Sequence, residues 1–259
     1  MRQAEVGSRL RQLENGVSEN NSLALSDLAA ELLQLPSRGQ RLTSRAAFLL
    51  GDPALAEVQG SLIAPTGTFA MQESQRITGI EDHALATGAH VAVFCQNDAS
   101  AVRLSFQVLE TKAALETRIR FLQSEKIRAL AAPRLQKRML GQVAQTFPIL
   151  PITATHISRY TTLAHDPNLL HTDITAAQAA GFTDVIAPGM LLCALAEMAV
   201  VHGNPQAKIH DLRARFLSPA LVNSVVQIIV SGKSEAMSRV FVVSDTHDIH
   251  VIVDVRTGE

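Results

Sequence analysis

The alternation of hydrophobic and polar residues predicts two groups of strands, one in each half of the chain. Seven runs are rich in Val, Ile and Phe, and several of them alternate apolar with polar positions, the period of two that is typical of strands that bury one face. The runs are HVAVFCQ (90–96), SAVRLSFQVLE (100–110), LETRIRFL (115–122), LRARFLSPA (212–220), SVVQIIVSGK (224–233), SRVFVVSD (238–245) and IHVIVDVR (249–256). Seven runs of this length predict antiparallel sheets.

Two other stretches have helical or continuous apolar patterns. Leucines recur at helical spacing between Leu23 and Leu33, with Ser26-Asp27 as a candidate helix start. The longest apolar run extends from Val185 to Val201 and is interrupted by Pro188 and Glu197. It is shorter than the ~20 residues that a membrane span needs, so we expect a buried helix of a soluble protein.

An internal repeat relates the two halves. SRAAFLLGDPAL (44–55) aligns without gaps on SRYTTLAHDPNL (158–169), with six of twelve positions identical. The related elements LIAPTG (62–67) and VIAPGM (185–190) follow. We therefore expect an α+β fold made of two copies of one unit, each with a turn, one long helix and an antiparallel sheet.

The repeat sets the expected boundaries along the chain. A basic, alanine-rich stretch with a proline at position 133 separates the copies and is interpreted as a linker. The expected segments are an N-terminal helical extension (1–43), a degenerate first unit (44–125), the linker (126–149) and a second unit (150–259).

The two copies differ where chemistry is expected. The interval from Asp52 to Pro65 is nine residues shorter than the interval from Asp166 to Pro188, and the missing segment is the one that carries His171. The first copy keeps an acid without a nearby base. We therefore expect one active site per chain, in the second copy, with Asp52 non-catalytic.

Composition narrows the class of partner. The 259 residues contain 23 Lys and Arg against 24 Asp and Glu, so no charge excess favours nucleic acid or an anionic membrane. Cys95 and Cys193 lie in apolar stretches, which favours reduced thiols. The charged N-terminus has no apolar core of a signal peptide. We expect a cytoplasmic protein.

The candidate chemistry is an acid and a base five residues apart, Asp166 and His171, around a turn that contains Asn168. A carboxylate and an imidazole that reach the same water can take a proton from it and return one. Further along, Gly189 and Met190 open the predicted buried helix, whose N-terminus offers unpaired N–H groups to a developing negative charge.

Plainer readings of these residues stay open. Asp166 could only cap a turn, and His171 could be structural. A metal site could be formed by His165, Asp166, His171 and Asp173. Glu197 could reach the pocket from the helix or sit at its solvent edge, and we keep it as a candidate supporting residue.

Two further pairs of residues have more than one interpretation. His247 and His250 are interpreted as a turn and a strand start. Arg213 and Arg215 alternate with apolar residues on a predicted strand, so they could bind phosphates or form a solvated face.

The second copy resembles a known family. YTTLAHDPNLLHTDITAAQAAGF (160–182) with VIAPGM (185–190) is similar to the signature of MaoC-like, (R)-specific enoyl-CoA hydratases, and RARFLSPA (213–220) is similar to their Arg-Phe-x-x-Pro strand. The matched positions are Asp166, Asn168, His171, Asp173, Gly189 and Met190. His165, Leu169 and Pro188 stand where the family usually has glycine, proline and histidine.

The resemblance implies a double hot dog fold, in which each antiparallel sheet wraps a long central helix. It implies an (R)-specific hydratase or dehydratase of enoyl-CoA thioesters in fatty acid metabolism, with Asp166 and His171 catalytic, Gly189 and Met190 binding the thioester, and Asn168 supporting them. Arg213 and Arg215 would bind CoA. No cofactor or metal is implied, and the chain would be a monomer or a homodimer.

Two alternative functions share this fold. One is a hot dog acyl-CoA thioesterase, and the other is a non-catalytic subunit that binds acyl-CoA or serves in assembly. We also expect the space left by the shorter first copy to admit the acyl chain, because exposed apolar surface beside a polar site suits such a ligand.

Overall fold

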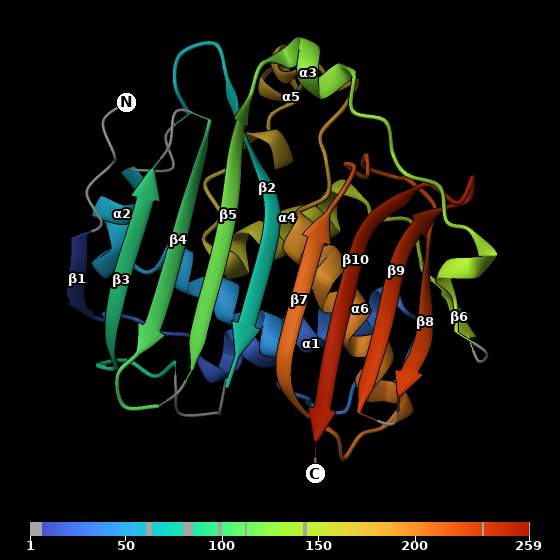
Figure 1. Cartoon of the computed structure of the whole chain (residues 1–259), viewed down its shortest axis with the longest axis horizontal. Helices are drawn as coiled ribbons and strands as arrows, with labels where there is room; N and C mark the ends of the chain where they lie inside the picture. Colours follow the sequence, from blue (N-terminus) through green and yellow to red (C-terminus); the bar gives the residue numbers. More distant parts are fainter. Residues whose placement is uncertain are drawn as a thin grey trace.

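A computed structural model describes residues 7–60, 64–79, 85–97, 100–111, 113–141, 144–234 and 236–258. In this part of the chain ten antiparallel strands form one continuous sheet in the order β1-β3-β4-β5-β2-β7-β10-β9-β8-β6 (Figure 1). The strands are β1 (Gly7–Gln12), β2 (Phe69–Thr78), β3 (His90–Asn97), β4 (Ala101–Val108), β5 (Ala114–Leu122), β6 (Ala144–Pro148), β7 (Lys208–Phe216), β8 (Val226–Ser234), β9 (Met237–Ser244) and β10 (Ile249–Gly258). All seven predicted strands are present, and the α+β class is confirmed.

The sheet is symmetric about the pair formed by β2 and β7. These strands pair from Ser74 with Arg215 to Thr78 with Asp211. On one side of this pair lie β5, β4, β3 and β1, and on the other β10, β9, β8 and β6. The two halves therefore have the same order of strands along the chain. Two copies of one unit would produce this order, and that origin stays a prediction.

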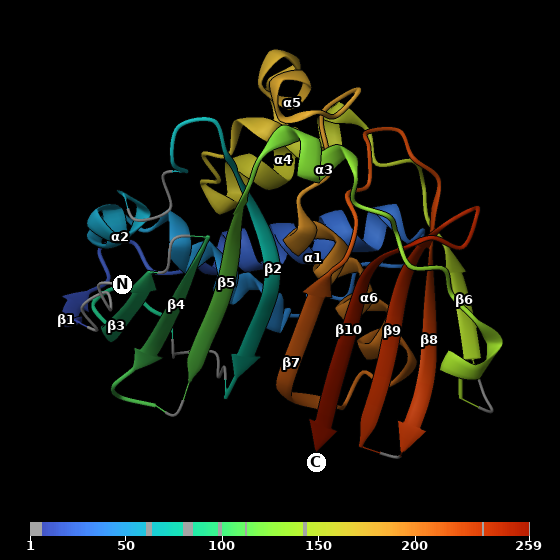
Figure 2. The same ribbon diagram turned by 45° about the horizontal axis from the view of Figure 1, so that its top comes forward.

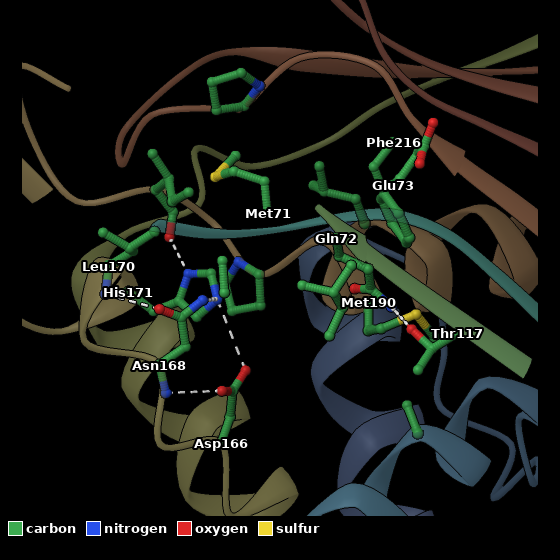
Figure 3. A pocket seen from close by; sticks show the side chains of 18 of the residues that line it. Met71, Gln72, Glu73, Thr117, Asp166, Asn168, Leu170, His171, Met190 and Phe216 are labelled. Carbon is green, nitrogen blue, oxygen red and sulfur yellow. Dashed lines mark hydrogen bonds and ion pairs between the residues drawn. The ribbon is translucent and has the colours of Figure 1, made fainter. Parts of the chain in front are cut away.

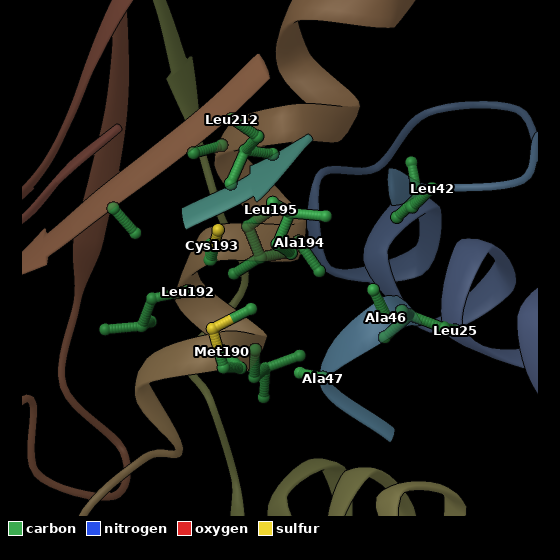
Figure 4. Packing of buried hydrophobic residues seen from close by; sticks show 14 of the residues in the cluster. Leu25, Leu42, Ala46, Ala47, Met190, Leu192, Cys193, Ala194, Leu195 and Leu212 are labelled. Atoms are coloured by element: carbon green, nitrogen blue, oxygen red, sulfur yellow. The ribbon is translucent and has the colours of Figure 1, made fainter. Parts of the chain in front are cut away.

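One long helix, α6 (Gly189–Gly203), lies against the second half of the sheet (Figures 1 and 4). Every residue from Met190 to Val201 is buried. A helix that is apolar on all sides has to be covered on all sides. The sheet covers one side, and α1 (Glu19–Leu32) and the 3-10 helix η1 (Thr43–Gly51) cover another. The predicted buried helix is confirmed.

Between positions 44 and 125 the described residues form no helix as long as α6, so the long helix expected in the first copy is not found there. The described residues that follow position 63 lead into β2, which pairs with β5 on one side and β7 on the other. Hydrogen bonding to a strand on each side outweighs the weak preference of the local sequence for another secondary structure. The short η1 packs against β2, β7, α4 (Ala154–Ala164) and α6 instead. Part of the repeat element 62–67 lies outside the described residues.

Two segments expected outside the sheet belong to it. β1 pairs with β3, and β6, inside the predicted linker, pairs with β8. The predicted helix of the N-terminal extension begins earlier than expected, because the hydroxyl of Ser18 accepts a hydrogen bond from the N–H of Asn21 and caps α1. Both edge strands and α1 therefore contribute to the folded unit.

The remaining short helices connect these elements. They are η2 (Pro53–Leu55), α2 (Ala56–Gly60), α3 (Ser124–Arg128), η3 (Lys137–Met139), η4 (Leu169–His171) and α5 (Ile174–Ala180). Figure 2 shows α3, α4 and α5 together at one end of the sheet, near the ends of β2 and β7. No helix of the described residues is long and apolar enough to cross a membrane. Cys95 and Cys193 do not form a disulfide with each other.

Candidate active site

The end of α4 positions the carboxylate of Asp166. His165 has a left-handed backbone (φ 48°) and ends the helix, and the N–H of Asp166 then donates to the carbonyl of Thr161. Oδ1 of Asp166 accepts a hydrogen bond of 3.0 Å from the N–H of Asn168. The turn therefore fixes one carboxylate oxygen and leaves Oδ2 for other partners.

The loop after this turn positions the imidazole of His171. Nδ1 lies 2.8 Å from the carbonyl oxygen of Ile186, which can only accept, so Nδ1 carries the proton of the neutral ring. Nε2 is then an acceptor, and the amide nitrogen of Asn168 lies 3.3 Å from it. The backbone thus sets the tautomer in which Nε2 can take a proton.

Asp166 and His171 face each other across a short gap (Figure 3). Oδ2 of the aspartate and Nε2 of the histidine are 3.7 Å apart, too far for a direct hydrogen bond. One water at about 2.8 Å from each atom fits this separation. The side chains are 27% and 8% exposed, so such a water would be largely shielded from solvent.

The N-terminus of α6 forms the adjacent wall. Pro188 precedes the helix and has no N–H, while its carbonyl accepts from Leu191 and Leu192. No hydrogen bond is found among the described residues for the N–H groups of Gly189 and Met190, as expected in the first turn of a helix. A β-carbon at Gly189 would lie 2.7 Å from ring atoms of Phe216, so close packing requires glycine here.

These groups border one cavity of about 770 Å³ that both halves of the sheet line. It lies where β2 and β7 stop pairing, beyond Ser74 and Arg215. The second half contributes the acid, the base and the helix start. The first half contributes Ala47, Leu50, Gly51, Met71, Gln72, Glu73, Thr117, Arg118 and Arg120 among others.

The structure brings most of the predicted site residues to this cavity. Those that line it are Asp166, Asn168, His171, Gly189, Met190, Arg213 and Arg215. Arg215 lies 3.7 Å from Asp254, and Arg213 is exposed. Their strand neighbours Leu212 and Ala214 are buried, so the two arginines lie on the outer face of the sheet.

Glu197 lies at neither of its expected places. It does not line the cavity and it is 1% exposed. Its carboxylate accepts hydrogen bonds from the N–H groups of Thr43 and Ser44, at the start of η1. Burial raises the pKa of this carboxyl. The expectation failed because the partner element is more than a hundred residues away in sequence.

Asp173, His247 and His250 also lie outside the lining of the cavity. Asp173 caps α5 by accepting from the N–H groups of Thr175 and Ala176. His247 lies in a turn, and His250 lies in β10 beside Ser218. Among the described residues, no three His, Cys, Asp or Glu side chains gather where they could hold a metal ion.

Tyr160, Gln72 and Thr117 are among the cavity residues that the sequence analysis did not propose. Tyr160 lines the cavity, and burial raises the pKa of its phenol, which therefore stays protonated. Tyr160 stands at the aromatic position of the family signature, and this position could have indicated that it lies at the site. Gln72 and Thr117 come from β2 and β5, and nothing in the first half indicated that they face a site in the second.

Comparison with known proteins finds a family model that matches this region. Residues 136–252 match the model described as MaoC like domain. This part of the chain is therefore similar to MaoC-like domains. A search of curated proteins by sequence finds no match.

Solved structures share the fold over nearly the whole chain. HtdX from Mycobacterium tuberculosis is 18% identical with a TM-score of 0.69, and the match covers 97% of this chain and 100% of HtdX. A MaoC-like dehydratase from Phytophthora capsici is 14% identical with a TM-score of 0.67, covering 98% and 96%. An acyl-ACP thioesterase from Bacteroides thetaiotaomicron is 10% identical with a TM-score of 0.50, covering 98% of each chain. At these identities the likeness concerns the fold.

Proposed function

We propose that the chain is an (R)-specific hydro-lyase that adds or removes water across the 2,3-double bond of an enoyl-CoA thioester. The observation that carries the proposal is the 3.7 Å gap between Oδ2 of Asp166 and Nε2 of His171, inside a cavity and beside the start of α6. The similarity of the region that contains both residues to MaoC-like domains supports the same reaction class.

The acid–base pair would hold and activate the water. In the hydration direction, the two hydrogens of the water face the carboxylate of Asp166 and Nε2 of His171. As the water oxygen bonds to Cβ, one proton passes to this pair, and one proton passes from the pair to Cα. Hydroxyl and hydrogen are thus added across the double bond, and the pair returns to its starting charge.

The start of α6 would stabilise the charge that develops on the thioester oxygen. The N–H groups of Gly189 and Met190 have no acceptor in the described part of the chain and lie at the positive end of the helix dipole. One such donor typically contributes ~10²–10³ in rate. Pro188 cannot donate here, so the N–H groups of the first helical turn carry this role.

The CoA part would lie at the outer face of the sheet. Arg213 and Arg215 line the cavity there, and guanidinium groups bind phosphates well. The (R) configuration rests on the family resemblance, because stereochemistry depends on which face of the double bond meets the water.

The test is to follow the enoyl absorbance of crotonyl-CoA with the purified chain. Loss of the band without free thiol, and an (R)-3-hydroxy product on chiral analysis, is the expected result. Release of free thiol would instead identify a thioesterase. No change in either signal across enoyl-CoA chain lengths would favour a binding protein, and an (S) product would contradict the stereochemistry.

The acid–base pair gives the first mutational prediction. Asp166→Asn and His171→Ala should each lower kcat by about 10²-fold or more, as is typical of acid–base residues. Thermal unfolding should change little, because both side chains face the cavity. Asp173→Asn, which changes a carboxylate that only caps α5, is the matched control and should keep kcat. Full activity in either variant of the pair would contradict the mechanism.

A further inference from the structure

A polar cluster lies on the wall that the first half contributes to the cavity. Gln72 of β2 and Thr117 of β5 line the cavity, and Gln75 of β2 hydrogen-bonds to Gln72. Thr117 and Gln75 are each 1% exposed. Nearby lining residues such as Leu50 and Met190 are apolar. Polar groups in such a wall are unfavourable unless a partner satisfies them.

The hydrogen bonds within the cluster do not satisfy all of its donors and acceptors. Nε2 of Gln72 donates to Oε1 of Gln75 at 2.8 Å and to Oγ1 of Thr117 at 3.3 Å. Among the described residues, no hydrogen bond is found for Oε1 of Gln72, and the buried Nε2 of Gln75 has no partner. The cluster therefore offers Oε1 of Gln72 to a ligand.

The same two amides can also offer a donor. If both amide groups turn over, Nε2 of Gln75 donates to Oε1 of Gln72. The hydroxyl of Thr117, which in this structure donates to the carbonyl of Ser74 at 3.5 Å, can turn to donate to the same oxygen. Nε2 of Gln72 then faces the cavity. The pair can thus meet either a donor or an acceptor on a ligand.

The position of the cluster indicates which part of the ligand it meets. In Figure 3, Gln72 and Thr117 lie beside Met190, across the cavity from Asp166 and His171. Along β5, Thr117 is buried while Arg118 is partly exposed and pairs with Glu73, so the arginine lies on the other face of the sheet. The charged end of CoA belongs with the arginines, and the cluster faces the acyl group.

We infer that Gln72 and Thr117, with Gln75 behind them, form a subsite for an acyl group that carries an uncharged hydrogen-bonding substituent, a hydroxyl or a carbonyl, beyond the double bond. The inference deepens the proposed function and rests on it for the identity of the thioester. A plain alkyl chain would strip water from Oε1 of Gln72 without replacing it. A carboxylate on the acyl group would be buried without a positive partner, because the arginines lie on the outer face of the sheet, and burial of an unpaired charge is unfavourable.

The experiment measures binding of saturated acyl-CoA thioesters, which cannot be hydrated, by titration calorimetry. Matched pairs have the same chain length, and one member carries a hydroxyl or a carbonyl at a successive carbon beyond Cγ. For the intact chain, at least one position should raise affinity about tenfold or more. Gln72→Leu should bring this ratio close to one, while Met71→Leu, a lining residue of the same strand without hydrogen-bonding groups, should keep it.

Each outcome decides the inference. No preference at any position would overturn it. Equal weakening of both members of a pair in Gln72→Leu would also overturn it, because the side chain would then contact the pantetheine arm that both share. If Gln72→Leu does not fold, as thermal unfolding will show, Thr117→Val replaces it and should reduce the same ratio. A preference for the polar acyl group without hydration of crotonyl-CoA or of the unsaturated polar thioester would overturn the proposed reaction and leave the subsite standing.

Discussion

The backbone holds each member of the acid–base pair by the atom that faces away from the reaction. The N–H of Asn168 binds Oδ1 of Asp166, and the carbonyl of Ile186 binds Nδ1 of His171. The two remaining atoms, Oδ2 and Nε2, face each other at 3.7 Å. Neither side chain has to reorganise when water arrives, and such preorganisation lowers the barrier to proton transfer.

The departure from the family motif at His165 has a structural explanation. The residue lies at the end of α4 with φ 48°, a conformation that favours glycine and that histidine tolerates better than most residues. The position needs this backbone angle to bring Asp166 into the cavity, which explains the glycine of the family motif. Histidine keeps the turn at some cost in stability.

His165→Gly should therefore raise the free energy of unfolding by up to about 1 kcal/mol, because glycine adopts positive φ without strain. His165→Val should lower it by about 1–2 kcal/mol, since a branched side chain opposes this conformation. Urea unfolding of the three proteins checks the order. A glycine variant less stable than the valine variant would show that the imidazole, and not φ, sets the turn.

At the scale of elements, α6 meets the end of β7 without space for a side chain at Gly189. A β-carbon would lie 2.7 Å from Cδ1 and Cε1 of Phe216, closer than such contacts occur. The ring thereby fixes where the helix begins. Because the N–H groups of the first turn are the proposed oxyanion donors, this packing contact also fixes the site.

Gly189→Ala should shift the helix start or the ring, and kcat should fall about tenfold or more because a donor loses its position. The matched control is Gly203→Ala at the other end of α6, where a β-carbon meets no atom within 4 Å. Adding Phe216→Leu to Gly189→Ala should restore part of kcat. If the alanine variant is as active as the intact chain, the contact does not position the donors.

Glu197 couples α6 to η1 through a carboxylate whose pKa is raised by burial. The folded chain then binds this proton more tightly than the unfolded chain does. The stability from this group is present below the unfolded pKa of about 4.5 and is lost as pH rises through the folded pKa.

The stability of the intact chain relative to Glu197→Gln should therefore decrease as pH rises from about 4.5, because glutamine does not titrate. Glu31→Gln is the control with the opposite sign, since the hydrogen bond from Arg159 lowers the pKa of Glu31. The stability of the intact chain relative to Glu31→Gln should increase as pH rises. Urea unfolding over a pH series measures both differences, and a rising difference for Glu197 would contradict the assignment.

The sequence predicted those elements that depend on residues close to one another in the chain. The strands β3, β4, β5 and β7–β10 coincide with runs rich in Val, Ile and Phe, several of which alternate, and α6 coincides with a long apolar run interrupted at Glu197, so local patterns were enough to predict these elements. β2 was missed because its register shifts between Gln72 and Ser74, which interrupts the alternation. The partners of Glu197 and the position of Gln72 depend on contacts between distant segments, which no local pattern contains.

At the scale of the whole molecule, the two halves share an order of strands but not a chemistry. The second half carries the acid and base, and the first half supplies the opposite wall of the cavity. The acids of the repeat make the same local turn: Asp52 accepts from the N–H of Ala54, as Asp166 does from Asn168. Both copies of the repeat therefore have the same turn, and the turn in the second half is followed by the base His171.

We expect Asp52 to serve the fold rather than a reaction. Its carboxylate is buried and also accepts from the N–H groups of Glu14, Asn15 and Gly16, which ties the end of β1 to the turn after η1. Asp166, by contrast, has one oxygen facing the cavity.

Asp52→Ala should lower the free energy of unfolding by about 2–4 kcal/mol, because four N–H groups lose a charged acceptor. Turnover of the folded variant should stay within a few-fold of the intact chain, since Asp52 does not line the cavity. The measurement pairs urea unfolding with crotonyl-CoA hydration at a temperature where the variant is folded. Asp166→Asn is the counterpart, with stability nearly unchanged and turnover lost. If Asp52→Ala abolished turnover while remaining folded, the first half would hold a second active site, and the assignment of one site per chain would be wrong.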